Sequence, residues 1–135
     1  GALADHLALY MKTKNFHWHV SGPRFRDLHL LFDEQATEIV GLVDVIAERV
    51  RKNDAPTLTS IGSISATSNI ADQDGKLDAD AMIKELRDDN RKLLDRLREV
   101  KETSEEAGDH ATNGLVDDWI DMAEQRVWFL SATLK

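Results

Sequence analysis

The chain has 135 residues, which is the size of one domain rather than two. It contains no cysteine, which excludes a disulfide scaffold, thiolate zinc sites and a cysteine nucleophile. Its 17 basic and 25 acidic residues leave a net charge of −8, which argues against a folded body that holds a phosphate backbone and suits partners that are cations. No apolar run approaches the roughly 20 residues of a membrane span, and the first residues do not resemble a signal peptide.

Two helices are predicted in the first part of the chain. Residues 3–20 carry apolar side chains at helical spacing, namely Leu3, Leu7, Tyr10 and Met11. Ser21-Gly22-Pro23 ends this segment, because Gly and Pro interrupt helices. Residues 25–51 predict one long amphipathic helix, with an apolar stripe of Phe25, Leu28, Phe32, Ala36, Ile39, Val43, Ile46 and Val50. Only Gly41 weakens it, by about 1 kcal/mol relative to Ala.

The rest of the chain predicts a long connection and two more helices. Residues 53–77 are rich in Ser and Thr, and a structureless loop longer than about 15 residues is uncommon, so we expect a short helix near residues 60–68. A third helix, capped by Asp78 or Asp80, ends near Gly108 and has an inner face of Ile83, Leu86, Asn90, Leu93, Leu97 and Val100. Asp109 is the expected N-cap of a fourth helix, whose inner face is Val116, Trp119 or Ile120, Ala123, Val127 and Leu130.

These elements predict the fold class. Four amphipathic helices with a long crossover between the second and the third form an all-α, antiparallel bundle of ferritin-like topology. The crossover separates this topology from a plain up-and-down bundle. Residues 1–135 are expected to form this single domain.

A polar stripe runs beside the apolar stripe of residues 25–51. It contains His29, Asp33, Asp44 and Glu48, which lie within about 100° of one another around the helix. The first two and the last two are each one turn apart, so each pair can present two metal-binding atoms to one point. The pairs are separated by about 16 Å of helix rise, so one chain cannot close a single site from both.

A second copy of the helix, antiparallel across a two-fold axis, would complete the site. His29 then faces Glu48 and Asp33 faces Asp44 in the same register, and the site occurs twice per dimer. Thr37, Val40 and Gly41 lie between the pairs and are small enough for close approach. Imidazole among carboxylates suits iron or manganese better than copper or structural zinc, so the interpretation is an intersubunit di-iron centre. The alternative is that such spacing on an exposed helix is more often a solvated polar face.

The site motifs stand within a longer pattern. Lys14-Asn15-Phe16-His17-Trp18-His19-Val20-Ser21-Gly22-Pro23 is followed by Phe25, then by His29 and Asp33, then by Asp44-Val45-Ile46-Ala47-Glu48-Arg49. The later motifs are Asp89-Asn90, Gly108-Asp109-His110-Ala111-Thr112, Trp119-Ile120-Asp121 and Trp128-Phe129-Leu130. Together they resemble the Dps family, the DNA-binding proteins from starved cells, which are the mini-ferritins of bacteria and archaea. The resemblance covers essentially the whole chain.

The resemblance implies a hollow shell of twelve four-helix subunits with a ferroxidase centre at each two-fold interface. Carried over position by position, it assigns metal binding and catalysis to His17, His29 and Asp33 of one chain and to Asp44 and Glu48 of its neighbour. Such a centre oxidises Fe(II), characteristically with hydrogen peroxide, and the shell stores the ferric product as mineral, which protects DNA from oxidative damage. From the residues alone, His17 and His19 around a Trp are more often structural than ligating.

Further residues have two interpretations each. Trp18, next to His17, could exchange an electron during oxidation, although packing is the more common role of such a residue. Asp117, Asp121 and Glu124 could line a three-fold pore that draws in Fe(II), with Asp118 as an alternative, or could form an ordinary acidic surface. Thr112-Asn113-Gly114 departs from the commoner family pattern and leaves the start of the fourth helix, and hence the pore mouth, open.

DNA binding is the less certain part of the family resemblance. In the family it usually resides in a mobile tail rich in Lys and Arg, and neither visible end of this sequence carries one. The sequence opens with Gly1 rather than Met, so a preceding segment could supply that charge; we favour protection by iron chemistry alone. A DNA-compacting protein with secondary iron oxidation, an inert bundle, and zinc or manganese as the resident ion are the alternatives. The expected location is the cytoplasm, with nucleoid association left open.

Overall fold

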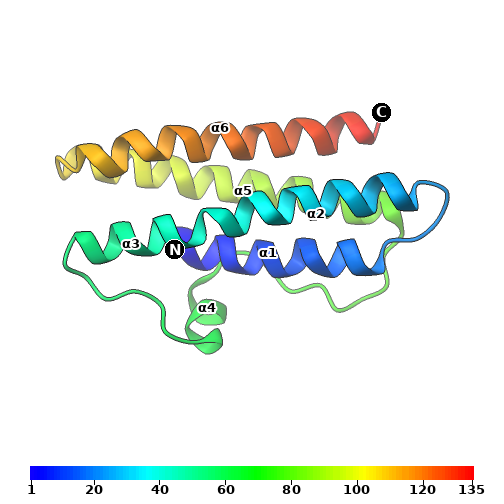
Figure 1. The fold of residues 1–135 in the computed structure, drawn as a ribbon, viewed down its shortest axis with the longest axis horizontal. Coiled ribbons are helices and arrows are strands. Elements are labelled where there is room, and N and C mark those ends of the chain that lie inside the picture. The colour runs from blue at the N-terminus through cyan, green and yellow to red at the C-terminus, as the bar shows by residue number, and fades with distance from the viewer.

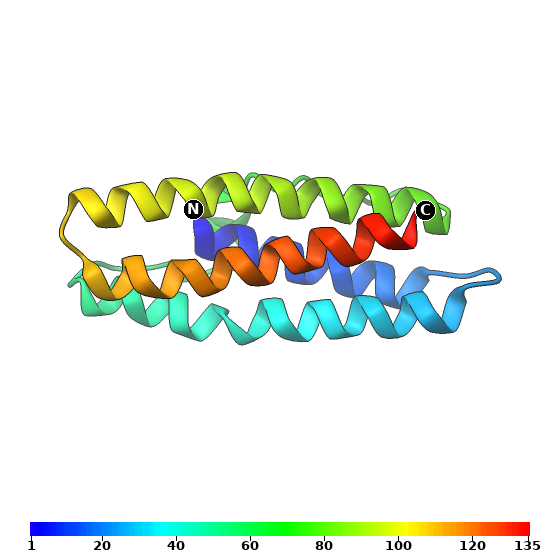
Figure 2. The same cartoon turned by 90° about the horizontal axis from the view of Figure 1, so that it is seen from above.

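The computed structural model describes all of residues 1–135 and contains six α-helices and no strand. The bundle is formed by α1 (Ala2–His19), α2 (Phe25–Gly41) with its continuation α3 (Val43–Lys52), α5 (Ala79–Glu106) and α6 (His110–Thr133), whereas the short α4 (Ile61–Thr67) lies outside it (Figure 1). Figures 1 and 2 show α1 and α6 running in one direction and α2, α3 and α5 in the other. The connection from α3 to α5 therefore crosses the length of the bundle, which confirms the ferritin-like topology.

Short-range polar signals set the helix ends where the sequence predicts them. Ser60 caps α4 through a reciprocal pair of hydrogen bonds with Ser63, which confirms the short helix in the connection. Asp78, rather than Asp80, caps α5 by accepting a hydrogen bond from the backbone N–H of Ala81 at 2.8 Å. Asp109 caps α6 and accepts from the backbone N–H of Thr112 at 3.1 Å. Each cap satisfies an N–H group that the first helical turn leaves unpaired.

The prediction of one continuous helix over residues 25–51 is wrong, because the helix is interrupted at Leu42. The backbone N–H of Leu42 bonds to the carbonyl oxygen of Ile39, three residues back, at 3.2 Å. This bond tightens one turn, as 3₁₀ geometry does, and it directly follows Gly41, a weak helix former. The helix resumes with Val43 in nearly the same direction (Figure 1).

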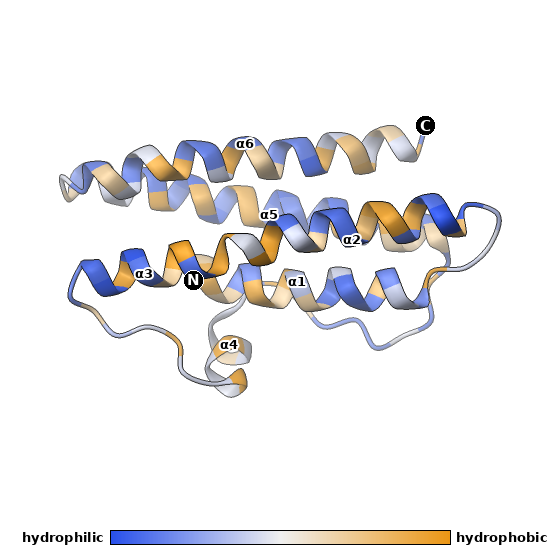
Figure 3. Cartoon of the chain, in the orientation of Figure 1, coloured by the Kyte–Doolittle hydropathy of each residue, from blue (hydrophilic) through white to orange (hydrophobic).

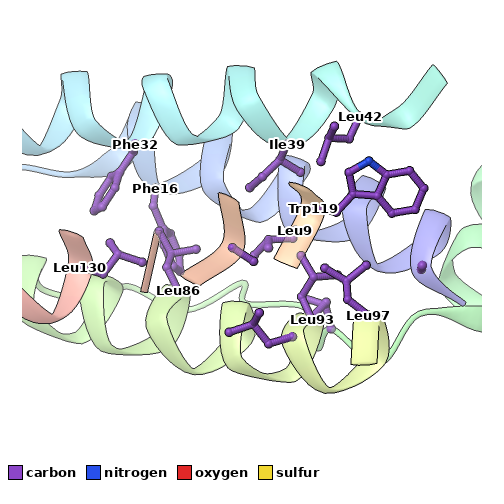
Figure 4. Packing of buried hydrophobic residues seen from close by; sticks show 14 of the residues in the cluster. Leu9, Phe16, Phe32, Ile39, Leu42, Leu86, Leu93, Leu97, Trp119 and Leu130 are labelled. Atoms are coloured by element: carbon purple, nitrogen blue, oxygen red, sulfur yellow. The ribbon is translucent and has the colours of Figure 1, made fainter. Parts of the chain in front are cut away.

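The core lies between the four long helices, where large apolar side chains interdigitate (Figure 4). The predicted inner faces of α5 and α6 are buried, with Val100 and Val127 only partly so, and Trp119 rather than Ile120 points inward. In the predicted stripe of residues 25–51, the placement of Phe25 in the core is wrong, because 43% of its surface is exposed. Leu42 is buried after the helix break, while Val43 is only packed against the edge of the core.

The buried face of α1 is more polar than apolar spacing alone predicts. Met11 is 55% exposed, while His6 and Thr13 are fully buried. Each of these two polar side chains donates to the carbonyl oxygen four residues earlier: His6 Nδ1 to Ala2 at 2.7 Å and Thr13 Oγ1 to Leu9 at 2.7 Å. These bonds offset the burial of Thr13 Oγ1 and His6 Nδ1, whereas His6 Nε2 is buried without a hydrogen-bond partner.

Polar side chains of α1 also hold the long connection against the bundle. Asp5 is buried and accepts from the backbone N–H of Asn69 at 2.7 Å. Lys12 donates to the carbonyl oxygen of Ala71 at 2.8 Å and forms a buried ion pair with Asp89 at 2.7 Å. Asp5 and Lys12 thus bind backbone atoms of the connection, at Asn69 and Ala71, and fix it against α1. None of the helices has the length and apolar character needed to span a membrane.

Candidate metal centre

The α1–α2 turn determines which residues of the two helices meet. Gly22 has a φ of +105°, a conformation that side-chain-bearing residues rarely adopt, and Pro23 follows it. The backbone N–H of Phe25 bonds to the carbonyl oxygen of Gly22 at 3.0 Å and closes the turn. The chain therefore returns antiparallel to α1 within a few residues. This reversal places His17, near the end of α1, against His29, near the start of α2.

His17 and His29 hold each other through their backbones. His17 Nδ1 donates to the carbonyl oxygen of His29 at 2.6 Å, and His29 Nδ1 donates to that of His17 at 2.8 Å. The two rings are stacked, with centroids 3.9 Å apart and planes inclined by 14°. Because a carbonyl oxygen only accepts, each Nδ1 carries the proton, and each Nε2 of the neutral ring keeps its lone pair. Metal-binding histidines are oriented in this way, with the second ring nitrogen fixed by a hydrogen bond.

Asp33 adds a carboxylate beside this pair. Its Oδ1 lies 3.7 Å from His17 Nε2. Two ligand atoms that are each about 2.1 Å from one divalent ion can be separated by up to about 4 Å, so this spacing fits shared coordination. The same oxygen accepts a hydrogen bond from Lys14 Nζ at 2.9 Å. That bond, aided by the positive charge around it, holds the pKa of Asp33 below its ordinary value, so the carboxylate is ionised at neutral pH.

The remaining two predicted ligands lie elsewhere in the chain. Asp44 and Glu48 are exposed on α3 and form no ion pair within the chain. Asp44 follows Asp33 by about 16 Å of helix rise. Within one chain no group of three or more His, Asp or Glu side chains is arranged to hold a metal ion. The structure places His17 against His29 and beside Asp33, and we call these three residues the half-site; Asp44 and Glu48 remain a separate pair of carboxylates.

The two residues that flank this half-site on α1 have different surroundings. Trp18 is 55% exposed, and its ring centroid lies 5.7 Å from Lys14 Nζ. The Nδ1 of His19 is occupied by the carbonyl and side-chain oxygens of Asn15, at 2.8 and 2.7 Å. His19 thus bonds to the last turn of α1, and its exposed ring lies outside the stacked pair of His17 and His29.

Comparisons with known proteins agree with this fold. The profile of the ferritin-like domain family matches residues 1–135. The DNA protection during starvation protein of Brevibacillus brevis is 32% identical over 133 residues, which cover 98% of this chain and 89% of that protein. The chain belongs to the Dps family of ferritin-like proteins.

Solved structures of Dps proteins share the fold over almost the whole chain. Dps from Thermosynechococcus elongatus aligns with a TM-score of 0.96 at 29% identity, covering 99% of this chain and 85% of that one. Dps from Vibrio cholerae, described as a member of a broad superfamily of ferritin-like diiron-carboxylate proteins, aligns with a TM-score of 0.94 at 31% identity, covering 99% and 84%.

Two positioning features of this Dps-family chain do not follow from the spacing of its apolar residues. Phe25, predicted in the core, instead stacks on His29 with ring centroids 5.0 Å apart. Arg49, next to Glu48, donates to Asp109 at 2.9 Å and to Thr112 Oγ1 at 2.9 Å, which ties α3 to the start of α6. The position of Phe25 beside a turn is a signal for the first. The second joins residues about sixty positions apart, and no local pattern reveals it.

The acidic residues of α6 do not converge within one chain. Asp117 forms an ion pair with Lys101 at 2.9 Å, and its side chain is 63% exposed. Asp118, Asp121 and Glu124 are also exposed. The unusual segment Thr112-Asn113-Gly114 lies inside α6, which begins normally at His110. The assignment of these carboxylates to a pore stays a prediction.

Proposed function

We propose that this chain is the subunit of an iron-storage ferroxidase that oxidises Fe(II) at a centre shared by two chains and stores the ferric product inside a shell. The observation that carries the proposal is the half-site on α1 and α2. Two imidazoles have their Nδ1 atoms held by backbone carbonyls, and Asp33 lies 3.7 Å from His17 Nε2. Membership of the ferritin-like family and the diiron-carboxylate description of the Vibrio cholerae relative support iron as the metal.

The surface around the middle of α2 and α3 supports a second copy as the partner. Val40 is 38% exposed and Val45 is 37% exposed. Figure 3 shows hydrophobic residues on both sides of the junction between α2 and α3. A Cβ atom added at Gly41 would meet nothing within 4 Å, so nothing within the chain requires a glycine there. Close approach of a helix from another chain would explain a glycine at position 41. In antiparallel register, Asp44 and Glu48 of the partner subunit face Asp33 and His29, and a twelve-subunit shell would contain this site at every two-fold axis.

The chemistry of such a centre follows from its ligands. Neutral imidazole nitrogens and carboxylates bind Fe(II), and the carboxylates lower the electrostatic cost of accumulating positive charge as it becomes Fe(III). Two Fe(II) ions give up one electron each, and hydrogen peroxide takes both electrons with two protons and becomes two water molecules. The oxidant is consumed without release of a hydroxyl radical, which is how DNA would be protected. The exposed Asp121 and Glu124 are the proposed entry for Fe(II).

The experiment uses the metal-free assembled protein, sized by light scattering. Stopped-flow absorbance after mixing with Fe(II) and hydrogen peroxide should show oxidation much faster than in buffer, and faster than with air. Glu48→Gln should slow this by a factor of about ten or more, since a carboxylate ligand becomes neutral. Glu102→Gln, the same change on the exposed face of α5, is the matched control and should oxidise iron at the original rate.

Two results would contradict the proposal at different points. A shell that oxidises Fe(II) no faster than buffer would leave the fold intact and remove the activity. An undiminished rate in Glu48→Gln would refute the site. The rival function, DNA compaction, predicts a gel shift that weakens with salt; the net charge of −8 argues against such binding by the folded body.

A further inference from the structure

Lys14 is the cationic side chain at the His17–His29–Asp33 half-site. Its Nζ donates to Asp33 Oδ1 at 2.9 Å and lies 5.7 Å from the centroid of the Trp18 ring. The Lys14 side chain is only 21% exposed, while that of Asp33 is 46% exposed. The ammonium group is thus held between a carboxylate and the face of an indole, and most of its stem is packed.

The oxygen that Lys14 occupies is the one best placed for a metal. Asp33 Oδ1 is also the atom 3.7 Å from His17 Nε2. A divalent cation bound to both atoms would sit about 2 Å from this oxygen, close to the ammonium group. Two positive charges at such a separation repel each other, even at the screened dielectric of a protein surface. Metal binding at Asp33 Oδ1 therefore favours displacement of Lys14 from that oxygen.

Trp18 offers Lys14 a second position without any change in the backbone. The two residues are one helical turn apart on α1, where side chains face each other. An ammonium group within about 6 Å of an indole ring is already attracted to its face. Rotation of the Lys14 side chain alone would exchange the carboxylate for closer contact with the ring.

We propose that Lys14 is a displaceable internal cation of the half-site: it neutralises Asp33 while the site is empty and moves onto the face of Trp18 when a divalent metal binds. The proposal rests on the proposed function for the assignment of the half-site. It gives Lys14 two effects. The lysine lowers metal affinity by competing for Asp33, and it couples metal occupancy to the electrostatic environment of Trp18.

The experiment measures binding of Zn(II), which is redox-inert, to the assembled protein by calorimetry and by tryptophan fluorescence. Lys14→Met should bind Zn(II) about three- to tenfold more tightly, since a partly exposed ion pair is removed along with a repulsive charge. In the unchanged protein, fluorescence should shift in proportion to occupancy. That shift should largely disappear in Lys14→Met, and also in Trp18→Phe, which leaves only the indoles of Trp119 and Trp128.

Controls separate this proposal from the assignment of the site. Lys84→Met removes an equal charge from the exposed face of α5 and should change neither the affinity nor the fluorescence shift. Lys14→Arg should restore affinity close to that of the unchanged protein. Equal Zn(II) affinity and an intact fluorescence shift in Lys14→Met would overturn the proposal. Undiminished Zn(II) binding in a His29→Ala/Asp33→Asn double variant would instead show that the half-site itself is assigned wrongly.

Discussion

A mixture of two inactive variants should recover iron oxidation if the centre is shared between chains. One variant carries His29→Ala and Asp33→Asn and loses the α2 ligands. The other carries Asp44→Asn and Glu48→Gln and loses the α3 carboxylates. Each variant alone has only damaged sites. In a mixed dimer, one of the two sites combines both damaged halves, while the other combines both intact halves.

The expected recovery follows from counting sites. Random pairing of equal amounts makes half of the dimers mixed, and each mixed dimer has one intact site out of two. About a quarter of the original sites, and hence about a quarter of the original rate, should return. The measurement is stopped-flow iron oxidation of co-expressed, differently tagged subunits, with the subunit ratio checked by mass spectrometry. Two unchanged subunits with the same tags provide the reference rate.

The recovered rate distinguishes a shared centre from a site within one subunit, because the two pairs of ligands are far apart in one chain. Asp33 and Asp44 are separated by about 16 Å of helix rise, and no group of three or more ligand side chains forms within the chain. A site assembled inside one subunit would be broken in every chain of the mixture. The rate would then remain at the level of the separate variants, and the shared centre would be refuted.

Three further predictions concern the scaffold that holds the half-site. Burial lowers the pKa of His6 from 6.5 to about 4, so only the unfolded chain takes up a proton at His6 as the pH falls from 6.5 toward 4. The free energy of unfolding should therefore fall by about 3 kcal/mol in total over that range, and not above pH 6.5. Urea unfolding between pH 6.5 and 5 should show a smaller loss of stability for His6→Gln than for the unchanged protein. Asp109→Ala removes the α6 N-cap and the partner of Arg49, which should cost about 1–2 kcal/mol in thermal unfolding, whereas Asp109→Asn keeps an acceptor and should cost less. Gly22→Ala must adopt a φ of +105° and should destabilise the protein by about 1–2 kcal/mol, whereas Gly114→Ala, within α6 and with open space around it, should not destabilise it.

The parts of the fold that depend on residues close together in the sequence were predictable. Ser60, Asp78 and Asp109 each cap a helix by accepting from an N–H three residues later, so a short window of sequence contains the whole interaction. The break at Leu42 and the exposure of Phe25 were not predictable from periodicity. The exposure of Phe25 depends on its packing against His29, and the break at Leu42 follows Gly41, a weak helix former; the spacing of apolar residues describes neither.

By itself the sequence determined the types of the candidate ligands, their spacing on the helix and the conclusion that one chain does not supply a closed site. These follow because helical rise is fixed and carboxylates and imidazoles keep their chemistry in any fold. Only the tertiary structure decided which nitrogen of each imidazole is free and which cation sits on Asp33. The Gly22 turn brings backbone carbonyls of one helix to the rings of the other, and it brings Lys14 to a carboxylate 19 positions away. Such contacts depend on how two helices are set against each other, which no local pattern in the chain encodes.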